Sequence, residues 1–99
     1  MMNNDRSVIF ALGLAQKAGK IASGDFAVKV ALKGGKVKLL VIASDASDNS
    51  KKDLYYMADL YAVKTVETLD REQLGIAIGK AKRTAVAVLD ANFANMMKV

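Results

Sequence analysis

Lysines are concentrated around a predicted helix start, an arrangement that suits the binding of an anion. Six lysines occupy positions 17, 20, 29, 33, 36 and 38, with one acid, Asp25, among them. Their balance of +5 equals the formal net charge of the whole 99-residue chain. At the helix start, Gly24 leaves the backbone free, and the N–H groups of Gly24, Asp25 and Phe26 lack intrahelical acceptors. Such groups suit phosphate oxygens, and Lys20 and Lys29 lie close to them in sequence.

A second basic group, Lys80-Ala81-Lys82-Arg83, places three cations in four residues before a predicted strand. If this loop lies beside the helix start, the two groups form one basic surface. A pI of about 9.6 favours a polyanionic partner such as nucleic acid. The alternative is a set of lysines scattered over a solvated surface, because a charge of +5 also serves solubility.

Residue types that usually catalyse reactions are scarce in this chain. It contains no cysteine and no histidine, which excludes a thiolate nucleophile, a thiolate zinc site and the commonest general base. Asp45 and Asp48 follow a predicted strand, with Lys51 near, as in a metal or phosphoryl-transfer site at a sheet edge. Asp and Ser in such a loop more commonly form turns and cap helices, and Gly34-Gly35 end a helix, whereas a phosphate loop begins one. We therefore predict no enzyme, no catalytic or metal-binding residue and no cofactor.

Capping residues and glycines mark the expected helix boundaries. The predicted N-caps are Asn3 or Asn4, Ser23, Ser50, Asp70 and Asp90, and the predicted helix ends are Gly19, Gly34-Gly35 and Gly79. The strongest local signal is at Asp70, where Gln73 can complete a capping box and Leu69 can pack on Leu74.

The second helix carries Phe26, Ala27, Val30 and Ala31 at helical spacing, and Phe26 has two interpretations. Phe26 and Val30, an i, i+4 pair, can face the core, or Phe26 can be exposed as a platform on which a base stacks. We favour the core, because an aromatic residue at helical spacing usually belongs to the packing.

Two apolar runs, 39–43 and 84–89, are predicted to form strands that are buried on both faces. Residues 63–67 are a weaker candidate for the sheet edge, and 20–22 suffice only for a very short strand. Helices alternate with these strands, which predicts an α/β protein, a three-layer α/β/α sandwich. With 53% hydrophobic residues we expect one domain over 1–99. Neither a signal peptide nor an apolar run of ~18 residues is evident, so we expect a cytoplasmic protein.

Four segments form an ordered set. They read Ala-x-Lys-Ala-Gly-Lys-Ile-x-Ser-Gly over 15–24, Lys-Gly-Gly-Lys-x-Lys-Leu over 33–39, Leu-Val-Ile-Ala-x-Asp over 40–45 and Gln-Leu-Gly-x-Ala-x-Gly over 73–79. In this order and spacing they resemble the kink-turn-binding ribosomal proteins of the L-seven-Ae and L-thirty-e types, and above all their small bacterial branch. The resemblance implies a four-stranded mixed sheet, with RNA held by the second helix start and the loop before the last strand.

The resemblance also maps single positions. In the family, the glycine at the helix start is followed two and three residues later by Asn-Glu or Lys-Gln, which read tandem sheared G·A pairs, and one turn later by a lysine. Here these positions hold Phe26, Ala27 and Val30, while Arg71 matches a basic position that reaches the RNA backbone. The residues that we assign to RNA contact are Lys20, Gly24, Asp25, Phe26, Ala27, Lys29, Arg71, Lys80, Ala81, Lys82 and Arg83.

We therefore expect a monomeric, non-catalytic RNA-binding protein of ribosomal type with no membrane partner. Its partner would be a structured RNA, such as a kink-turn or an internal loop of ribosomal RNA. The alternative is a protein-interaction module associated with the translation or transcription machinery, which a basic surface without the base-reading pair would also suit.

Overall fold

The computed structural model describes residues 2–97, with side chains from residue 5 onward, and in that part helices alternate with strands as predicted. The helices are α1 (Met2–Lys17), α2 (Asp25–Lys33), α3 (Asp48–Leu60), α4 (Arg71–Ala77) and α5 (Ala91–Met96). The strands are β1 (Ile21–Ser23), β2 (Leu39–Ile42), β3 (Thr65–Glu67) and β4 (Ala85–Val88). None of these helices is long and apolar enough to cross a membrane.

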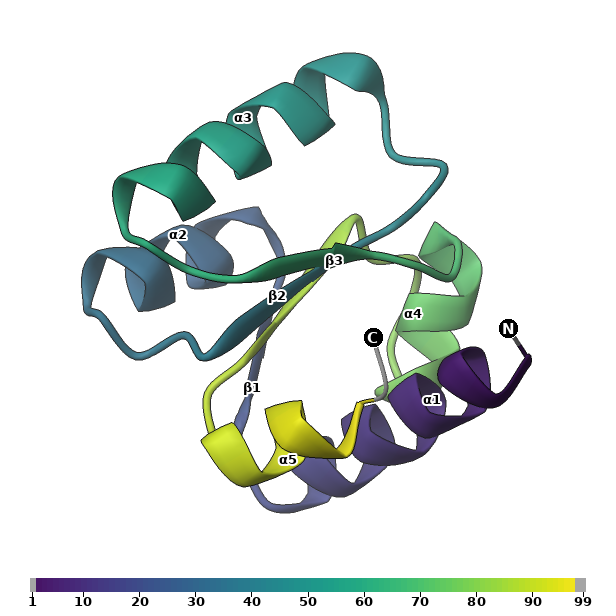
Figure 1. The fold of residues 1–99 in the computed structure, drawn as a ribbon. Helices are drawn as coiled ribbons and strands as arrows, with labels where there is room; N and C mark the ends of the chain where they lie inside the picture. The colour runs from purple at the N-terminus through teal and green to yellow at the C-terminus, as the bar shows by residue number, and fades with distance from the viewer. Residues whose placement is uncertain (1, 98–99) are drawn as a thin grey trace.

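The four strands form one mixed sheet in the order β1-β4-β2-β3. Strand β4 runs antiparallel to both of its neighbours, and β2 runs parallel to β3. Helices α2 and α3 cover one face of this sheet, while α1, α4 and α5 cover the other (Figure 1). The predicted three-layer α/β/α sandwich around a four-stranded mixed sheet is confirmed.

The core follows from the position of each strand in the sheet. Every residue of the central strands β2 and β4 is buried, because helices pack on both of their faces. The edge strands β1 and β3 are shorter and only partly buried. The apolar runs predicted to be central strands and the weaker run predicted to be an edge are therefore confirmed.

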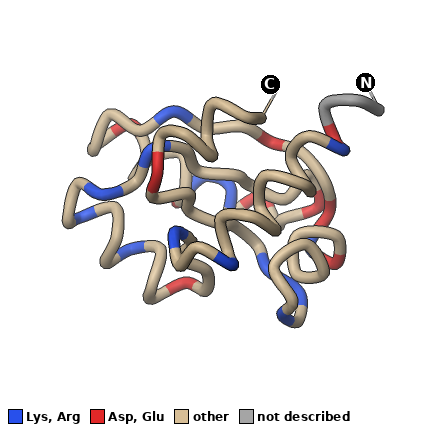
Figure 2. The backbone as a smooth tube through the Cα atoms, turned by 90° about the horizontal axis from the view of Figure 1, so that it is seen from below, with Lys and Arg blue, Asp and Glu red and all other residues tan. Residues whose placement is uncertain are grey.

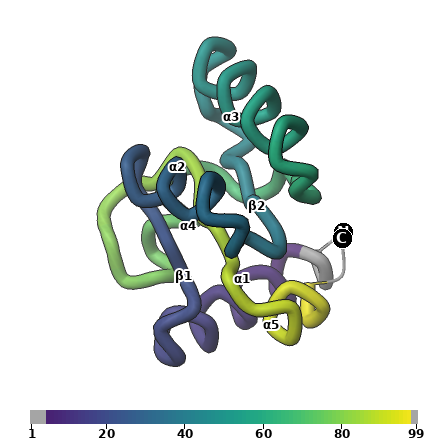
Figure 3. Tube along the Cα trace, turned by 90° about the vertical axis from the view of Figure 1, so that its left-hand side faces the viewer, coloured from purple at the N-terminus to yellow at the C-terminus, as the bar shows by residue number. Residues whose placement is uncertain are grey.

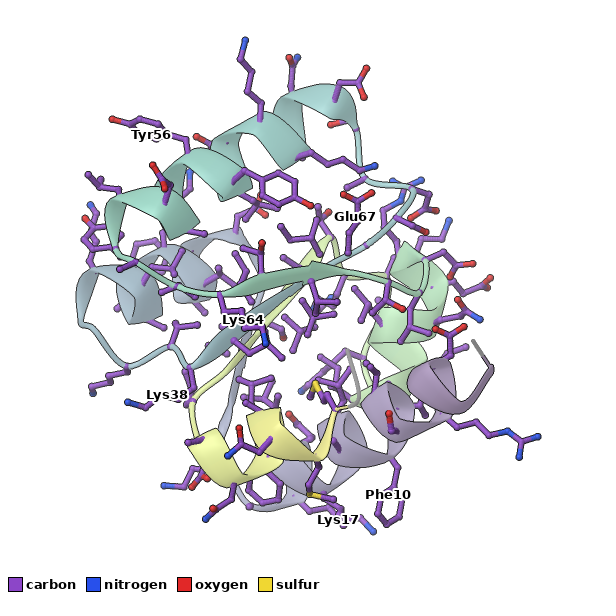
Figure 4. The ribbon with its side chains drawn as sticks, in the orientation of Figure 1. Phe10, Lys17, Lys38, Tyr56, Lys64 and Glu67 are labelled. Carbon is purple, nitrogen blue, oxygen red and sulfur yellow. The ribbon has the colours of Figure 1, made fainter. Side chains whose placement is uncertain are left out.

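Side chains from α3 hold the edge strand β3 in place. Lys51 donates a hydrogen bond to one carboxylate oxygen of Glu67 at 2.8 Å, and the Tyr55 hydroxyl donates to the other at 2.7 Å. Figure 4 shows Glu67 reaching from β3 toward α3. The hydrogen bond from Lys51, and then that from Tyr55, hold the pKa of Glu67 below its ordinary value of 4.5.

Two predicted helix starts are confirmed by their side-chain caps. Asp70 accepts a hydrogen bond from the backbone N–H of Gln73, whose side chain accepts one from the Asp70 N–H in return, which completes the predicted capping box. Asp90 caps α5 by accepting from the N–H of Asn92.

Three predicted helix starts are wrong. The cap of α3 is Ser47, which accepts from the N–H of Ser50, so this helix begins before Ser50. Ser23 remains in β1, because its pairing with Val86 of β4 extends the strand, and Gly24 occupies the cap position of α2. Helix α1 already includes the predicted caps at positions 3 and 4, whose side chains lie outside the described part.

The end of α3 contains a residue in an unusual backbone conformation. Ala62 has a φ of 56°, in the left-handed region that favours glycine. Its N–H bonds to the carbonyl of Asp59, and the N–H of Val63 bonds to that of Ala58, as in a Schellman motif. The same pattern closes α1, α2 and α4, but there the left-handed residue is a glycine.

Candidate nucleic-acid interface

The N-terminus of α2 offers backbone donors without a side-chain cap. Gly24 occupies the cap position with φ 94° and ψ 150°, a conformation that residues with a Cβ rarely adopt. No side chain caps this helix end, so its first N–H groups lack the acceptor that a capping side chain would supply. Asp25 places one acid in the first turn, and an anion at this point would therefore need cations from elsewhere.

The basic loop 80–83 is positioned by the end of α4. The N–H of Lys80 bonds to the carbonyl of Gly75 at 2.8 Å, and Gly79 adopts a φ of 70°. Gly75 is buried against the backbone of Lys80 and Ala81, so closely that a Cβ at Gly75 would overlap the Ala81 carbonyl group. The helix end predicted at Gly79 is confirmed.

Arg83 joins this loop to the N-terminus of α2. Its Nε donates to the Ser23 hydroxyl at 3.2 Å, and its guanidinium also donates to the carbonyls of Ala81 and Lys82. The juxtaposition follows from the sheet, since β4 begins directly after the loop and pairs antiparallel with β1, which ends at α2. Figure 3 shows the loop after α4 beside β1 and the start of α2. The structure thus places the basic loop beside the start of α2, two features that the sequence left separate.

A small cavity of about 90 Å³ lies at this junction, between the first turns of α2 and α3 and the start of β4. Gly24, Lys29, Asp53 and Thr84 are among its lining residues. Lys29 forms an ion pair with Asp53 at 3.7 Å, and both side chains are about half exposed, so this pair contributes little to stability. Lys29 therefore stays accessible next to the N-terminus of α2.

Arg71 is connected to the same loop through the backbone. Its carbonyl accepts a hydrogen bond from the N–H of Arg83 at 3.0 Å. Its own N–H donates to Asp45 at 2.9 Å, and its Nε lies 3.5 Å from the other oxygen of that carboxylate. The hydrogen bond from the Arg71 backbone and then the charge of Arg71 hold the pKa of Asp45 below its ordinary value of 3.8, although desolvation opposes them. Asp45 thus connects the turn after β2 to the first residue of α4, in agreement with its predicted role as a turn residue.

Exposure separates the residues of the loop. Lys80 and Lys82 are exposed, and neither forms an ion pair within residues 5–97. Arg83 is partly buried, because its side chain is occupied with the contacts described above. The two lysines can reach a partner, whereas Arg83 holds the loop. In the described part, no three Asp or Glu side chains are grouped as metal ligands.

Lys20 does not lie with the others. The Lys20 carbonyl accepts a hydrogen bond from the N–H of Leu89. Lys20 therefore lies at the start of β1, whereas Ser23 and the N-terminus of α2 lie at the other end of this strand. The expectation that Lys20 stands close to this helix end is therefore wrong, because the strand between them is extended. The surface around α2 is nevertheless basic. Helix α2 lies on the left in Figure 1, and the same side of Figure 2 shows more basic than acidic positions.

The preferred interpretation of Phe26 is also wrong. Its side chain is 81% exposed, and that of Val30 is 53% exposed. The buried residues of α2 are Val28, Ala31 and Leu32. Two stripes of this helix are apolar, and the sheet covers the stripe of Val28 and Leu32, which leaves Phe26 and Val30 on the outer face.

Sequence reasoning missed Ser23 as a contact of Arg83 and Thr84 as part of the junction. Ser23 directly precedes the predicted helix start at Gly24, and Thr84 directly follows the basic loop 80–83. The antiparallel pairing of β1 with β4 brings these two residues together. That pairing joins residues more than 60 positions apart and has no local sequence signature.

Comparison with known proteins places the chain in a family. A model of the Ribosomal protein L7Ae/L30e/S12e/Gadd45 family matches residues 7–98. The chain belongs to this family. A solved structure described as a protein with unknown function from Bacillus halodurans C superposes with a TM-score of 0.84 at 32% identity, covering 93% of this chain and 97% of that one.

Named relatives in the family are RNA-binding and ribosomal proteins. RNA-binding protein YlxQ of Bacillus subtilis (strain 168) is 37% identical over 86 residues, which cover 87% of this chain and 86% of that protein. Large ribosomal subunit protein eL30 of Eremothecium gossypii is 32% identical over 96 residues, which cover 95% and 91% of the two chains. The predicted family is thus confirmed, and with it the non-enzymatic character of the chain.

Proposed function

We propose that this protein binds a structured RNA through a basic surface formed by 24–29, Arg71 and 80–83. The observation that carries the proposal is the hydrogen bond from Arg83 to Ser23, which fixes the basic loop beside the free N-terminus of α2. Backbone N–H groups at a helix start and lysines around them are the groups that most commonly contact nucleic-acid phosphates. The names of the YlxQ and eL30 relatives support RNA as the polyanion.

The class of RNA that we propose is one with an internal loop, of which the kink-turn is one form. Phe26 and Ala27 stand where the family has its readers of sheared G·A pairs, and Val30 stands where it has a lysine; none of these three side chains can donate or accept a hydrogen bond. Recognition would then depend on the shape of the backbone and on unpaired bases, as is usual for RNA. We further propose that the protein acts as a monomer in the cytoplasm, where ribosomal RNA is found.

Charge reversal of the exposed lysines tests the proposal. In Lys80→Glu/Lys82→Glu the net charge falls from +5 to about +1 while Arg83 is kept, because its side chain holds the loop. The matched control is Lys38→Glu/Lys64→Glu, which changes the charge equally on exposed lysines that Figure 4 shows on another side of the molecule. The probe is a pool of RNA hairpins whose stem is interrupted by an internal loop of random sequence.

Salt dependence provides the measurement. If about four phosphates are neutralised, log K should fall with log salt with a slope of about −3 to −4. In the Lys80/Lys82 variant this slope should be less steep by about 2, because two phosphate contacts are removed. At ~0.15 M salt this variant should bind at least tenfold more weakly, while the control stays within about threefold of the wild type. Equal losses in both variants would mean that only net charge matters, and a flat salt dependence would remove the electrostatic basis of the proposal.

A further inference from the structure

The outer face of α2 carries a groove that the basic surface does not explain. Phe26, Val30 and Leu89 line it together with small residues of α2, and its volume is about 470 Å³. Phe26 is the most exposed of the large hydrophobic side chains in the part of the chain that has described side chains. An exposed aromatic ring above an apolar groove generally indicates a binding surface.

Charge around this groove is positive. Lys36 is the charged residue that lines it, and Lys33 is exposed one turn after Val30 on the same face of α2. Among the acids of neighbouring segments, Asp25 is exposed in the first turn of α2, Asp53 is paired with Lys29, and Asp90, which follows Leu89, accepts the Asn92 N–H as the cap of α5. An occupant should therefore combine a flat apolar surface with negative charge beside it.

A nucleotide with an unpaired base has this combination. Its base can stack on an aromatic ring, and its phosphate can lie near lysines, the pattern by which proteins hold single-stranded RNA segments. The groove also begins at the N-terminus of α2, where we place RNA phosphates, because Phe26 is the second residue after Gly24.

We infer that the groove along α2 receives an unpaired base of the bound RNA, stacked on Phe26. This inference rests on the proposed function. It gives Phe26 a role different from hydrogen-bonded readout of a G·A pair, since the ring accepts any base by its flat face. The protein would then select RNA by the availability of an unpaired base next to a paired stem.

The test compares three variants on two RNAs, the internal-loop pool and a fully paired stem of the same length. Phe26→Ala should weaken binding to the pool about 5- to 150-fold, because stacking on one base is worth ~1–3 kcal/mol. It should leave binding to the paired stem within twofold. Phe26→Tyr keeps the ring and should bind the pool like the wild type. Phe10→Ala is the matched control, because Phe10 is 63% exposed but lies on α1, where Figure 4 shows it pointing away from the molecule.

Photocrosslinking with 4-thiouridine in the loop, followed by mass spectrometry, gives the second measurement. The inference expects a crosslinked peptide that contains Phe26. Equal affinities of wild type and Phe26→Ala for the pool, or equal losses on both RNAs, would overturn it and leave the proposed function standing. Loss of self-association in Phe26→Ala, with RNA binding unchanged, would assign the groove to a second copy of the chain. If the wild type binds neither RNA, the proposed function itself fails.

Discussion

Replacing Gly75 by alanine would test whether the close packing of α4 positions the basic loop. A Cβ on Gly75 would overlap the carbonyl group of Ala81, at 2.6 Å from its carbon, and would lie 3.0 Å from the Lys80 oxygen. These atoms belong to the backbone, so no change of rotamer can relieve the overlap. The loop would have to move by at least about 0.8 Å to bring the Ala81 carbon from 2.6 Å to an ordinary contact of 3.4 Å, and farther to clear the Ala81 oxygen, which lies closer still.

The magnitude follows from two opposing effects. Overpacking costs about 1–3 kcal/mol, whereas a glycine-to-alanine change inside a helix gains about 1 kcal/mol. Gly75→Ala should therefore range from neutral to about 2 kcal/mol less stable than the wild type. Gly13→Ala is the matched control, because Gly13 also lies in a helix but its Cβ would meet only the Ala77 oxygen, at 3.7 Å. The control should gain most of the ~1 kcal/mol, so the two variants should differ by ~1–3 kcal/mol.

Urea unfolding measures this difference, and hydrogen exchange shows where it arises. In Gly75→Ala the amides of Lys80 and Arg83, which bond to the Gly75 and Arg71 carbonyls, should exchange faster than in the wild type. Binding to the internal-loop RNA pool should weaken with them. A Gly75→Ala protein as stable as Gly13→Ala, with unchanged exchange at these amides, would refute the reasoning.

Three further variants test other features. Ala62→Gly should stabilise the protein by about 0.5–1 kcal/mol in urea unfolding, because it relieves a left-handed alanine but adds unfolded-state entropy; a loss would contradict this. Glu67 has a lowered pKa, so its contribution is present above about 4.5 and is lost as the pH falls through its folded-state pKa. In Glu67→Gln the free energy of unfolding should therefore fall less steeply as the pH is lowered. An unchanged pH dependence would show that the Glu67 carboxylate does not contribute to it. Phe26→Asn/Ala27→Glu/Val30→Lys should bind a kink-turn RNA at least tenfold tighter, since each regained contact is worth ~1–3 kcal/mol; equal binding to an RNA without G·A pairs would reject the mapping.

Much of the fold was predictable because its signals are local or strongly periodic. The capping box at Asp70 uses two side chains three positions apart, and the central strands are continuous apolar runs. The caps of α2 and α3 were mispredicted because several residues in each segment can cap. At Ser47 and Ser50 the choice depends on where the helix meets the sheet, and at Ser23 the pairing with β4 takes priority.

The site was only partly predictable, for a related reason. Sequence composition identified the lysines and the free helix start, but the position of the loop relative to that start depends on the order β1-β4-β2-β3. The outward direction of Phe26 was missed because α2 has two apolar stripes, and only the packing on β1 and β4 shows which of them is buried. Close approach at Gly75 identifies a positioning residue that no charge pattern could reveal.

Salt and stacking should make separable contributions to RNA binding by this surface. Lysines such as Lys80 and Lys82 act through released counterions, so their loss changes the slope of log K against log salt. A ring such as Phe26 displaces no counterion, so its loss should lower log K by the same amount at every salt concentration and leave the slope unchanged. Because neither group reads a hydrogen-bond pattern, discrimination among RNAs would come from the shape that brings an unpaired base next to paired backbone. A protein with this surface should therefore tolerate changes of base identity in the loop far better than closure of the loop by pairing.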